Sequence, residues 1–330
     1  MNHTDAAVAR WDAYWKHGFL TSCADAFDGN YGGSIRDHWS KLFDLLEAEQ
    51  CVLDICTGNG AVAALAAQHA LDVSLPRRVV GVDLAAIEPQ RALKDQPHLL
   101  EHIEFLPRTP ANATGLAPAS VDLVCGQYAL EYTPRQATVA EIARVTRPGG
   151  TASFILHHDQ SVIMLTTREE LGHRERLAQC DDILEAAFAL GNIVASASTA
   201  EQRQALGSNP AAEAARNRLN AVAAILTEAA QNSTSPEILL TVMGYAKKIY
   251  SVAGGGNLTN AQTLVTRGRD EIAANFARLD DLCAAALTRV QLETLADNFV
   301  REGFESPELD SLIHDNLLIG WTLTTRRRAT

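Results

Sequence analysis

One stretch of this chain constrains its fold more than any other: an apolar run that passes through an acid into a glycine turn and then into an alanine-rich segment. Residues 52–63 read Val-Leu-Asp-Ile-Cys-Thr-Gly-Asn-Gly-Ala-Val-Ala. Gly58 permits a tight reversal of the chain, Gly60 lets a ligand approach bare backbone, and Ala63 is small enough for a helix to pack on the strand. The pattern predicts a strand, a nucleotide-binding turn and a helix, and it leaves the nucleotide open.

Apolar runs of strand length alternate with helix-like segments after this turn, a pattern typical of a parallel sheet with helices between its strands. We expect helices over 61–69, 135–145 and 291–302, with a turn at 147–150 after the second. Two runs at 309–314 and 318–325, joined by Asp315 and Asn316, predict an antiparallel hairpin. The expected parallel strands are 51–55, 78–83, 103–106, 121–125 and 151–156.

The distribution of aromatic, strand-like and helix-like segments divides the chain into three predicted parts. Residues 1–50 read as an N-terminal helical cap rich in aromatic side chains, and residues 51–160 with 290–330 form the predicted sheet core. Residues 161–289 lack strand-like runs, so we expect a large all-helical insertion that acts as a lid, a substrate surface or a homodimer surface. The expected fold class is α/β, a doubly wound, Rossmann-like, mostly parallel sheet with an antiparallel C-terminal hairpin.

The composition narrows the classes of partner. The 330 residues are 47% hydrophobic, enough for a large core, and 28 Lys and Arg stand against 40 Asp and Glu, for a formal charge of -12. Such a balance argues against a nucleic-acid partner. The six cysteines show no metal-binding spacing and no disulfide framework, so we expect no metal. Without a signal pattern or an apolar run of ~20 residues, we expect a cytoplasmic, soluble protein with no membrane partner.

Asp54 separates two candidate cofactors, NAD and S-adenosylmethionine. It lies inside the first strand, four residues before Gly58, where an NAD fingerprint normally carries an apolar residue. The methionine part of S-adenosylmethionine carries an amino group near its sulfonium, and a carboxylate beside the turn can bind that amine directly or through water. Asp83, at the end of the second strand, can accept ribose hydroxyls from either cofactor. An NAD-dependent dehydrogenase therefore stays as the less favoured alternative.

Four motifs follow one another along the chain. They are Val52-Leu53-Asp54-x-x-x-Gly58-x-Gly60, Val79-Val80-Gly81-Val82-Asp83, Val121-Asp122-Leu123-Val124 and Glu141-x-x-Arg144-Val145-x-x-Pro148-Gly149-Gly150. In order and spacing they resemble the class I S-adenosylmethionine-dependent methyltransferases over about residues 50 to 160, and the final hairpin resembles the family's last two strands. The resemblance implies S-adenosylmethionine as methyl donor and S-adenosylhomocysteine as product.

The resemblance also implies which residues bind the cofactor. Asn112 and Ala113 occupy the place where the family meets the adenine, although the family usually has an acid at the position of Asn112. An amide oxygen can still accept the adenine amino proton. Asn59 departs from the family too, which often has a small residue there. The expected cofactor-binding set is Tyr31, Asp54, Thr57, Gly58, Asn59, Gly60, Asp83, Leu84, Asn112, Ala113 and Gln127.

The methyl acceptor is expected to lie at the carboxyl ends of the fourth and fifth strands. Residues 126–132 lack the Asn-Pro-Pro-Tyr sequence of enzymes that methylate adenine in nucleic acid, so similar enzymes suggest an oxygen or nitrogen of a small metabolite. A histidine there can remove a proton, but adjacent strand residues face opposite sides, so at most one is expected to reach the pocket. Alignment alone can suffice for methyl transfer. The candidate pocket residues are Tyr128, Glu131, Tyr132, His157 and His158.

Several other residues have both a binding and a structural interpretation. Aromatic residues of the cap could cover the sulfonium or simply pack in the core. Arg36 could hold the methionine carboxylate, whereas Arg267 and Arg269 fit a solvated helix face better than an acidic substrate site. For Asp122 we favour a bond to local backbone. The cap aromatics are Trp11, Tyr14, Trp15, Tyr31 and Trp39.

We therefore expect a transferase that moves a methyl group from S-adenosylmethionine to a small molecule by direct in-line displacement. Two alternatives stay open. One is a catalytically silent, cofactor-binding regulator or scaffold, and the other is a protein or peptide methyltransferase.

Overall fold

The structure is a computed structural model that describes residues 3–22, 29–180 and 182–329. The chain forms two compact units. The first, which we call the sheet unit, comprises Met1–Met164 and Ala285–Thr330, and the second, the helical unit, comprises Leu165–Ala284. The helical unit falls inside the segment 161–289, where the sequence predicts helices only.

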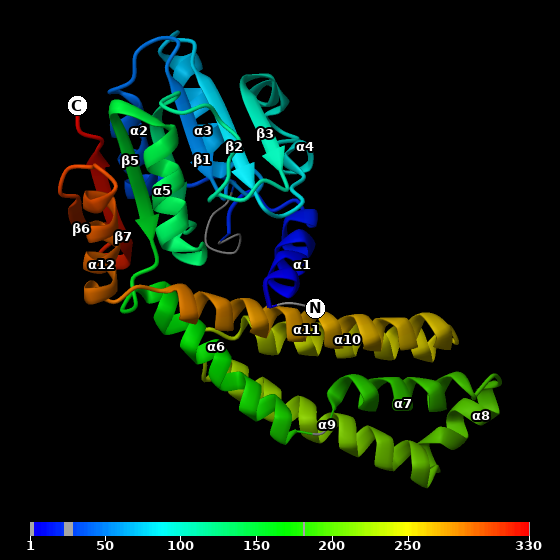
Figure 1. Cartoon of the computed structure of the whole chain (residues 1–330). Helices are drawn as coiled ribbons and strands as arrows, with labels where there is room; N and C mark the ends of the chain where they lie inside the picture. Colours follow the sequence, from blue (N-terminus) through cyan, green and yellow to red (C-terminus); the bar gives the residue numbers. More distant parts are fainter. Residues whose placement is uncertain (1–2, 23–28, 181, 330) are drawn as a thin grey trace. The chain divides into compact units, whose positions relative to one another are not determined.

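The sheet unit is built around a seven-stranded sheet with the order β3-β2-β1-β4-β5-β7-β6 (Figure 1). Strands β1 to β5 run parallel, and β7 pairs antiparallel with both β5 and β6. The predicted fold class is confirmed. The strands are β1 (Cys51–Ile55), β2 (Arg78–Asp83), β3 (Ile103–Pro107), β4 (Val121–Gln127), β5 (Thr146–Leu156), β6 (Glu308–His314) and β7 (Leu317–Arg326).

The closing hairpin forms as the sequence predicts. His314 pairs with Leu317, which leaves Asp315 and Asn316 as a two-residue turn with φ angles of 48° and 64°. Positive φ at both positions is what a type I′ hairpin turn requires, and Asp and Asn tolerate it better than most residues.

The separate turn predicted at residues 147–150 is wrong. Strand β5 begins at Thr146, directly after the preceding helix ends at Val145, and it contains these four residues. The register between β4 and β5 shifts between Val121 and Leu123, so a bulge takes up the extra residues. Gly149, with φ of 77°, supplies the backbone conformation that this irregularity needs.

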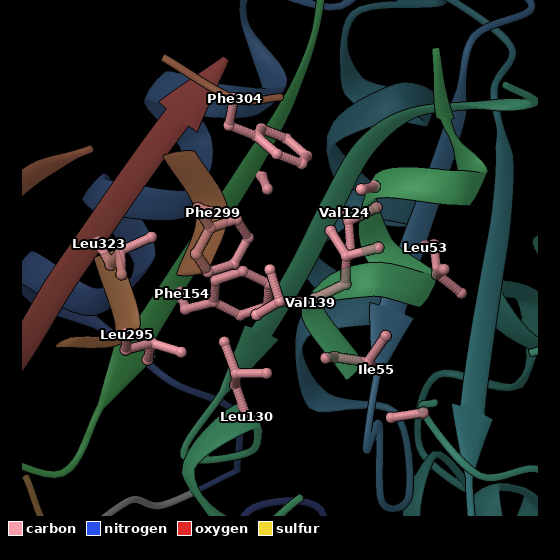
Figure 2. Packing of buried hydrophobic residues seen from close by; sticks show 14 of the residues in the cluster. Leu53, Ile55, Val124, Leu130, Val139, Phe154, Leu295, Phe299, Phe304 and Leu323 are labelled. Carbon is pink, nitrogen blue, oxygen red and sulfur yellow. The ribbon is translucent and has the colours of Figure 1, made fainter. Parts of the chain in front are cut away.

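Helices cover both faces of the sheet. Side chains of α2 and α3 share one apolar cluster with Val52, and those of α5 and α12 share another with Leu53 and Val124. Figure 2 shows the second cluster, where Phe154 of the sheet meets Phe299 with 5.9 Å between ring centroids. Both faces of β1, β2 and β4 are buried, which explains why these strands read as continuous apolar runs.

The helices of the sheet unit and of the helical unit are as follows. The sheet unit contains α1 (His3–Lys16), α2 (Gly33–Phe43), α3 (Ala61–Asp72), α4 (Pro89–Ala92), η1 (Pro97–His102), η2 (Leu130–Tyr132), α5 (Arg135–Val145) and α12 (Arg289–Arg301). The helical unit is made by α6 (Val162–Gln179), α7 (Ile183–Ala195), α8 (Ala200–Ala205), η3 (Leu206–Ser208), α9 (Pro210–Gln231), α10 (Glu237–Gly254) and α11 (Leu258–Ala285). Across the described ranges, none of the helices has the length and apolar character needed to cross a lipid bilayer.

Candidate functional site

The glycine turn connects the carboxyl end of β1 to α3, and Asp54 fixes its shape from inside. The Oδ2 atom of Asp54 accepts hydrogen bonds from the Thr57 hydroxyl at 2.6 Å and from the backbone N–H of Ala63 at 3.2 Å. The side chain is buried, and burial raises the pKa of Asp54 to about 7. Thr57 therefore faces the acid inside the turn.

Asp83 holds the same turn from the neighbouring strand. Its Oδ2 atom accepts from the Gly58 N–H at 2.8 Å, and its Oδ1 atom accepts from the Ala85 N–H at 2.7 Å. Burial raises the pKa of Asp83 to about 6. Two carboxyl groups thus lie at the carboxyl edge of β1 and β2, where open parallel sheets bind their ligands.

Gly58 and Gly60 are close to aromatic rings of the protein. Gly58 has φ of 55°, and a Cβ on it would lie 2.4 Å from the Trp15 ring. Gly60 has φ of 95°, and a Cβ there would lie 2.6 Å from the Phe105 ring. Phe105 of β3 occupies the space that a side chain at Gly60 would need, whereas the approach of a ligand to the Gly60 backbone stays a prediction.

Asn59 fastens the N-terminal segment to the turn. Its side-chain amide donates to the backbone carbonyls of Trp15 at 3.0 Å and Phe19 at 2.7 Å, and its Oδ1 atom accepts from the Glu88 N–H at 2.7 Å. The side chain is fully buried. Its polar atoms already serve backbone groups, so the structure gives Asn59 a holding role where the sequence predicts a cofactor contact.

Other contacts fix α1 beside the same edge of the sheet. Asp12 accepts from the Ala86 N–H at 2.7 Å and pairs with Arg108 at 2.7 Å. The Trp11 and Trp15 rings stack with centroids 5.7 Å apart. Asp12 and Phe105 belong to none of the sequence motifs, so these contacts were not predicted from the sequence. A helical cap over the glycine turn is thus formed by specific contacts.

Of the remaining aromatic residues of the cap, Trp39 and Tyr31 lie in the apolar core, and Tyr14 bonds the backbone of the N-terminal segment. Trp39 is fully buried and donates its indole N–H to Gln127 Oε1 at 2.8 Å, so Gln127 serves to anchor α2. Tyr31 is buried in the same cluster, and its carbonyl accepts from the exposed Arg36 at 3.3 Å. Tyr14 donates its hydroxyl to the Thr21 carbonyl at 3.0 Å.

The segment predicted to meet the adenine leaves its key side chains exposed. Asn112 and Ala113 are exposed, and Leu84, which follows Asp83, keeps 40% of its surface accessible. The loop is held by Glu141, whose Oε1 atom accepts from both the N–H of Thr114 at 2.8 Å and its hydroxyl at 2.6 Å. The Glu141-x-x-Arg144 motif thus positions a loop.

The carboxyl ends of β4 and β5 bring four of the five predicted pocket residues together. The Tyr128 ring stacks on the His157 ring at 4.1 Å, and Tyr132 meets His157 edge to face at 5.9 Å. Trp11 of α1 meets Tyr132 at 6.1 Å. Glu131 accepts the backbone N–H of His157 at 2.8 Å through Oε1.

Two polar atoms in this cluster have no hydrogen-bond partner within the described part of the chain: Glu131 Oε2 and His157 Nδ1. Both side chains are buried, and burial raises the pKa of Glu131 to about 7 and lowers that of His157 to about 3. Buried polar groups are normally paired, so these two atoms can bond a ligand or a water molecule.

The His158 side chain has different neighbours from His157, although β5 ends at Leu156 and neither histidine belongs to the strand. The His158 ring stacks on Trp321 at 3.8 Å, and its Nδ1 atom accepts from the Gln160 N–H at 2.9 Å. His157 is therefore the histidine in contact with the other pocket candidates, and His158 is removed from that group.

The contacts of Asp122, Arg267 and Arg269 agree with structural roles for these residues. Asp122 Oδ2 accepts the backbone N–H of Cys51 at 2.8 Å, near the amino end of β4. In the helical unit, Arg267 pairs with Glu271 at 2.7 Å, and Arg269 pairs with Asp182 at 2.5 Å. The charges of both arginines are thus compensated within the unit.

Comparison with known proteins identifies a protein family whose model matches part of the chain. Residues 52–150 match the family model described as a methyltransferase domain. No curated protein matches the chain. Among solved structures, geranyl diphosphate C-methyltransferase from Streptomyces coelicolor A3(2), in complex with S-adenosyl-L-homocysteine, is 17% identical with a TM-score of 0.31, and the match covers 36% of this chain and 43% of that one.

The YcgJ protein of Bacillus subtilis is 22% identical with a TM-score of 0.32, over 42% of this chain and 58% of that one. The chain thus spans less than two thirds of the length of either structure. The assignment rests on the domain match together with the sheet order and the motifs that hold the glycine turn. Residues 52–150 thus match a methyltransferase domain, in agreement with the four sequence motifs that resemble the class I S-adenosylmethionine-dependent methyltransferases.

Proposed function

We propose that this chain transfers a methyl group from S-adenosylmethionine to an oxygen or nitrogen of a small molecule. The observation that carries the proposal is the pair of buried carboxyl groups, Asp54 and Asp83, at the glycine turn. Each has a raised pKa because burial removes its charge from water. A ligand that brings an ammonium and a sulfonium to this edge supplies that positive charge, and NAD brings no comparable pair.

The residues around the turn fit the rest of such a cofactor. Asp83 keeps lone pairs beyond its two backbone bonds, and these can accept ribose hydroxyls. Leu84 offers an exposed apolar surface for the adenine, and the exposed Asn112 amide can accept its amino group. Trp15 beside Gly58 gives an aromatic wall over the turn. The cofactor itself supplies an activated methyl group.

Glu131 is the residue best suited to accept a proton from the acceptor. At neutral pH a carboxyl group with a pKa of about 7 is partly ionised, and the Glu131 Oε2 atom has no hydrogen-bond partner among the residues that the structure describes. His157, with a pKa of about 3, holds protons too weakly for that role. We therefore assign His157 and Tyr132 to orienting the acceptor and Glu131 to its proton.

Calorimetry measures which cofactor the protein binds, and two matched Asp→Asn variants test where it binds. Wild type is expected to bind S-adenosylhomocysteine and not NAD. Asp83→Asn is expected to weaken that binding about tenfold, or about 1.4 kcal/mol. Asp122→Asn, the same change at the opposite edge of the sheet, is expected to leave it unchanged. Tight binding of NAD alone would contradict the proposal.

Transfer of a labelled methyl group into fractionated host extract, with mass spectrometry of the product, tests the acceptor. We expect a labelled small molecule. Label found only in protein would favour the protein methyltransferase instead. Cofactor binding without transfer to any fraction would favour the regulator. Glu131→Gln is expected to lower the transfer rate with little change in cofactor affinity.

A further inference from the structure

The helical unit contains a cavity that its helices do not fill. Its volume is about 530 Å³, and five of the unit's helices contribute to it: α6, α7, α9, α10 and α11. Pockets of about 300–1,000 Å³ hold drug-sized molecules in other proteins. The side chains that surround its interior are mostly aliphatic or aromatic. Examples are Leu177, Ile183, Val222, Leu226, Val242 and Phe276.

The same side chains belong to the apolar cluster of the unit, so the cavity is part of its core. Leu226 and Val242 are buried although they border open space. Protein interiors normally leave few voids larger than a water molecule. The apolar side chains of the lining offer an ordered water almost no polar partners, so a ligand that covers them displaces water that is held only weakly.

Charged groups border the cavity only as ion pairs. Arg174 pairs with Asp280 at 2.7 Å, and Arg269 pairs with Asp182 at 2.5 Å. All four line the cavity, and their formal charges cancel. Their side chains are between 42% and 53% exposed, so they lie toward solvent while the aliphatic residues lie inside. Neither an anion nor a cation finds an unpaired counter-charge among these four groups.

We propose that the helical unit binds an uncharged, predominantly apolar small molecule in this cavity. Burial of the ligand's apolar surface against the surrounding side chains drives binding. The paired arginines and carboxylates select against ionised groups, because an ion entering the cavity loses water without gaining a partner. The proposal does not depend on the methyl-transfer reaction, since every residue that carries it lies in the helical unit.

Two dyes with the same aromatic skeleton test both the site and its charge preference. The full chain is titrated with N-phenyl-1-naphthylamine, which is uncharged, and with 8-anilinonaphthalene-1-sulfonate, which adds a sulfonate. We expect saturable fluorescence with one uncharged dye per chain and at least tenfold weaker binding of the sulfonate. Equal or tighter binding of the sulfonate would overturn the charge argument.

Substitutions that fill the cavity locate the dye. Ala277→Trp on α11 and Val242→Phe on α10 both add bulk at its lining, and each is expected to weaken dye binding at least tenfold. Ala224→Trp, at an exposed position of α9 outside the lining, is the matched control and is expected to change it less than twofold. Circular dichroism establishes that each variant is folded.

Two results would overturn the proposal. One is dye binding that persists unchanged in a folded filling variant, because the dye would then lie elsewhere. The other is a wild-type dimer that dissociates when the cavity is filled, since the cavity would then belong to the homodimer surface that the sequence suggests for this segment. Sedimentation of wild type and Ala277→Trp distinguishes this second result.

Discussion

Replacing Glu131 with Gln is expected to make the protein more stable at alkaline pH. Glu131 is buried, its Oε1 atom accepts the His157 N–H at 2.8 Å, and its Oε2 atom has no hydrogen-bond partner in the described residues. Burial raises its pKa from 4.5 to about 7. Ionisation of Glu131 therefore destabilises the folded protein, whereas the amide of the variant cannot ionise.

The sign and the size of this stability change follow from the pKa of Glu131 in the unfolded chain, 4.5, and in the folded chain, about 7. Below pH 4.5 the carboxyl group is protonated in the folded and the unfolded chain, so the stability that it contributes is fully present. As the pH rises toward 7 only the unfolded chain releases the proton, and that stability is lost. At about 1.4 kcal/mol per pH unit, the loss is about 3 kcal/mol. It is complete by about pH 8.

Urea unfolding of wild type and Glu131→Gln at pH 5, 6.5 and 8 measures the effect. The two free energies of unfolding are expected to be similar at pH 5 and to differ by about 3 kcal/mol at pH 8, with the variant more stable. Gln keeps the oxygen that accepts the His157 N–H, so the loop contact is preserved. Parallel pH dependence of the two proteins would refute the reasoning.

Glu141→Gln is the control with the opposite shift. The hydrogen bond from Arg144 holds the pKa of Glu141 down to about 2. The stability that Glu141 contributes is present above pH 4.5 and is lost only as the pH falls through 2. Its removal is therefore expected to cost the same free energy at pH 5, 6.5 and 8.

Three further predictions concern the glycine turn. Asn59→Ala removes the three hydrogen bonds of a buried side chain and is expected to lower the free energy of unfolding by about 3 kcal/mol. The exposed Asn112→Ala is expected to change it by less than about 0.5 kcal/mol, and equal losses in urea titrations would contradict this. Gly60→Ala is expected to cost about 1–2 kcal/mol for its positive φ alone, and more for contact with Phe105, so Phe105→Leu should recover part of the loss in a double-mutant cycle. Binding of S-adenosylmethionine near pH 6.5 is expected to release protons, because its cations lower the raised pKa of Asp54, and calorimetry in buffers of different ionisation enthalpy would show uptake if this is wrong.

The sequence predicts the sheet well because its signals are local. Strands β1, β2 and β4 are buried on both faces and read as apolar runs, and the hairpin turn is marked by Asp315 and Asn316. The bulge in β5 was not predictable from Pro148 and the glycines beside it, since the same residues also suit a turn. Pairing with β4, which is distant in sequence, decides between the two.

The sequence predicted where the acids of the candidate site lie, but it did not predict which residues contact the glycine turn. Asp54 and Asp83 lie at the turn as expected, because strand ends in a parallel sheet meet at one edge. The partners of Asn59 are carbonyl groups of a segment about 40 residues away, and Phe105 reaches Gly60 from β3. No local pattern encodes such contacts, since they depend on how α1 and β3 pack.

Position along a strand, and not residue type, distinguishes the acids of the motifs. Asp54, Asp83, Asp122 and Glu141 all accept backbone N–H groups, so the motifs fix loop geometry first. Asp122 is the second residue of β4 and bonds at the amino edge, where parallel sheets bind no ligand. Asp83 ends β2 at the opposite edge, and its remaining lone pairs therefore lie where a cofactor can use them. The same bond to backbone is thus structural at the amino edge of the sheet, whereas at the carboxyl edge we propose that it also orients the Asp83 carboxyl group for binding.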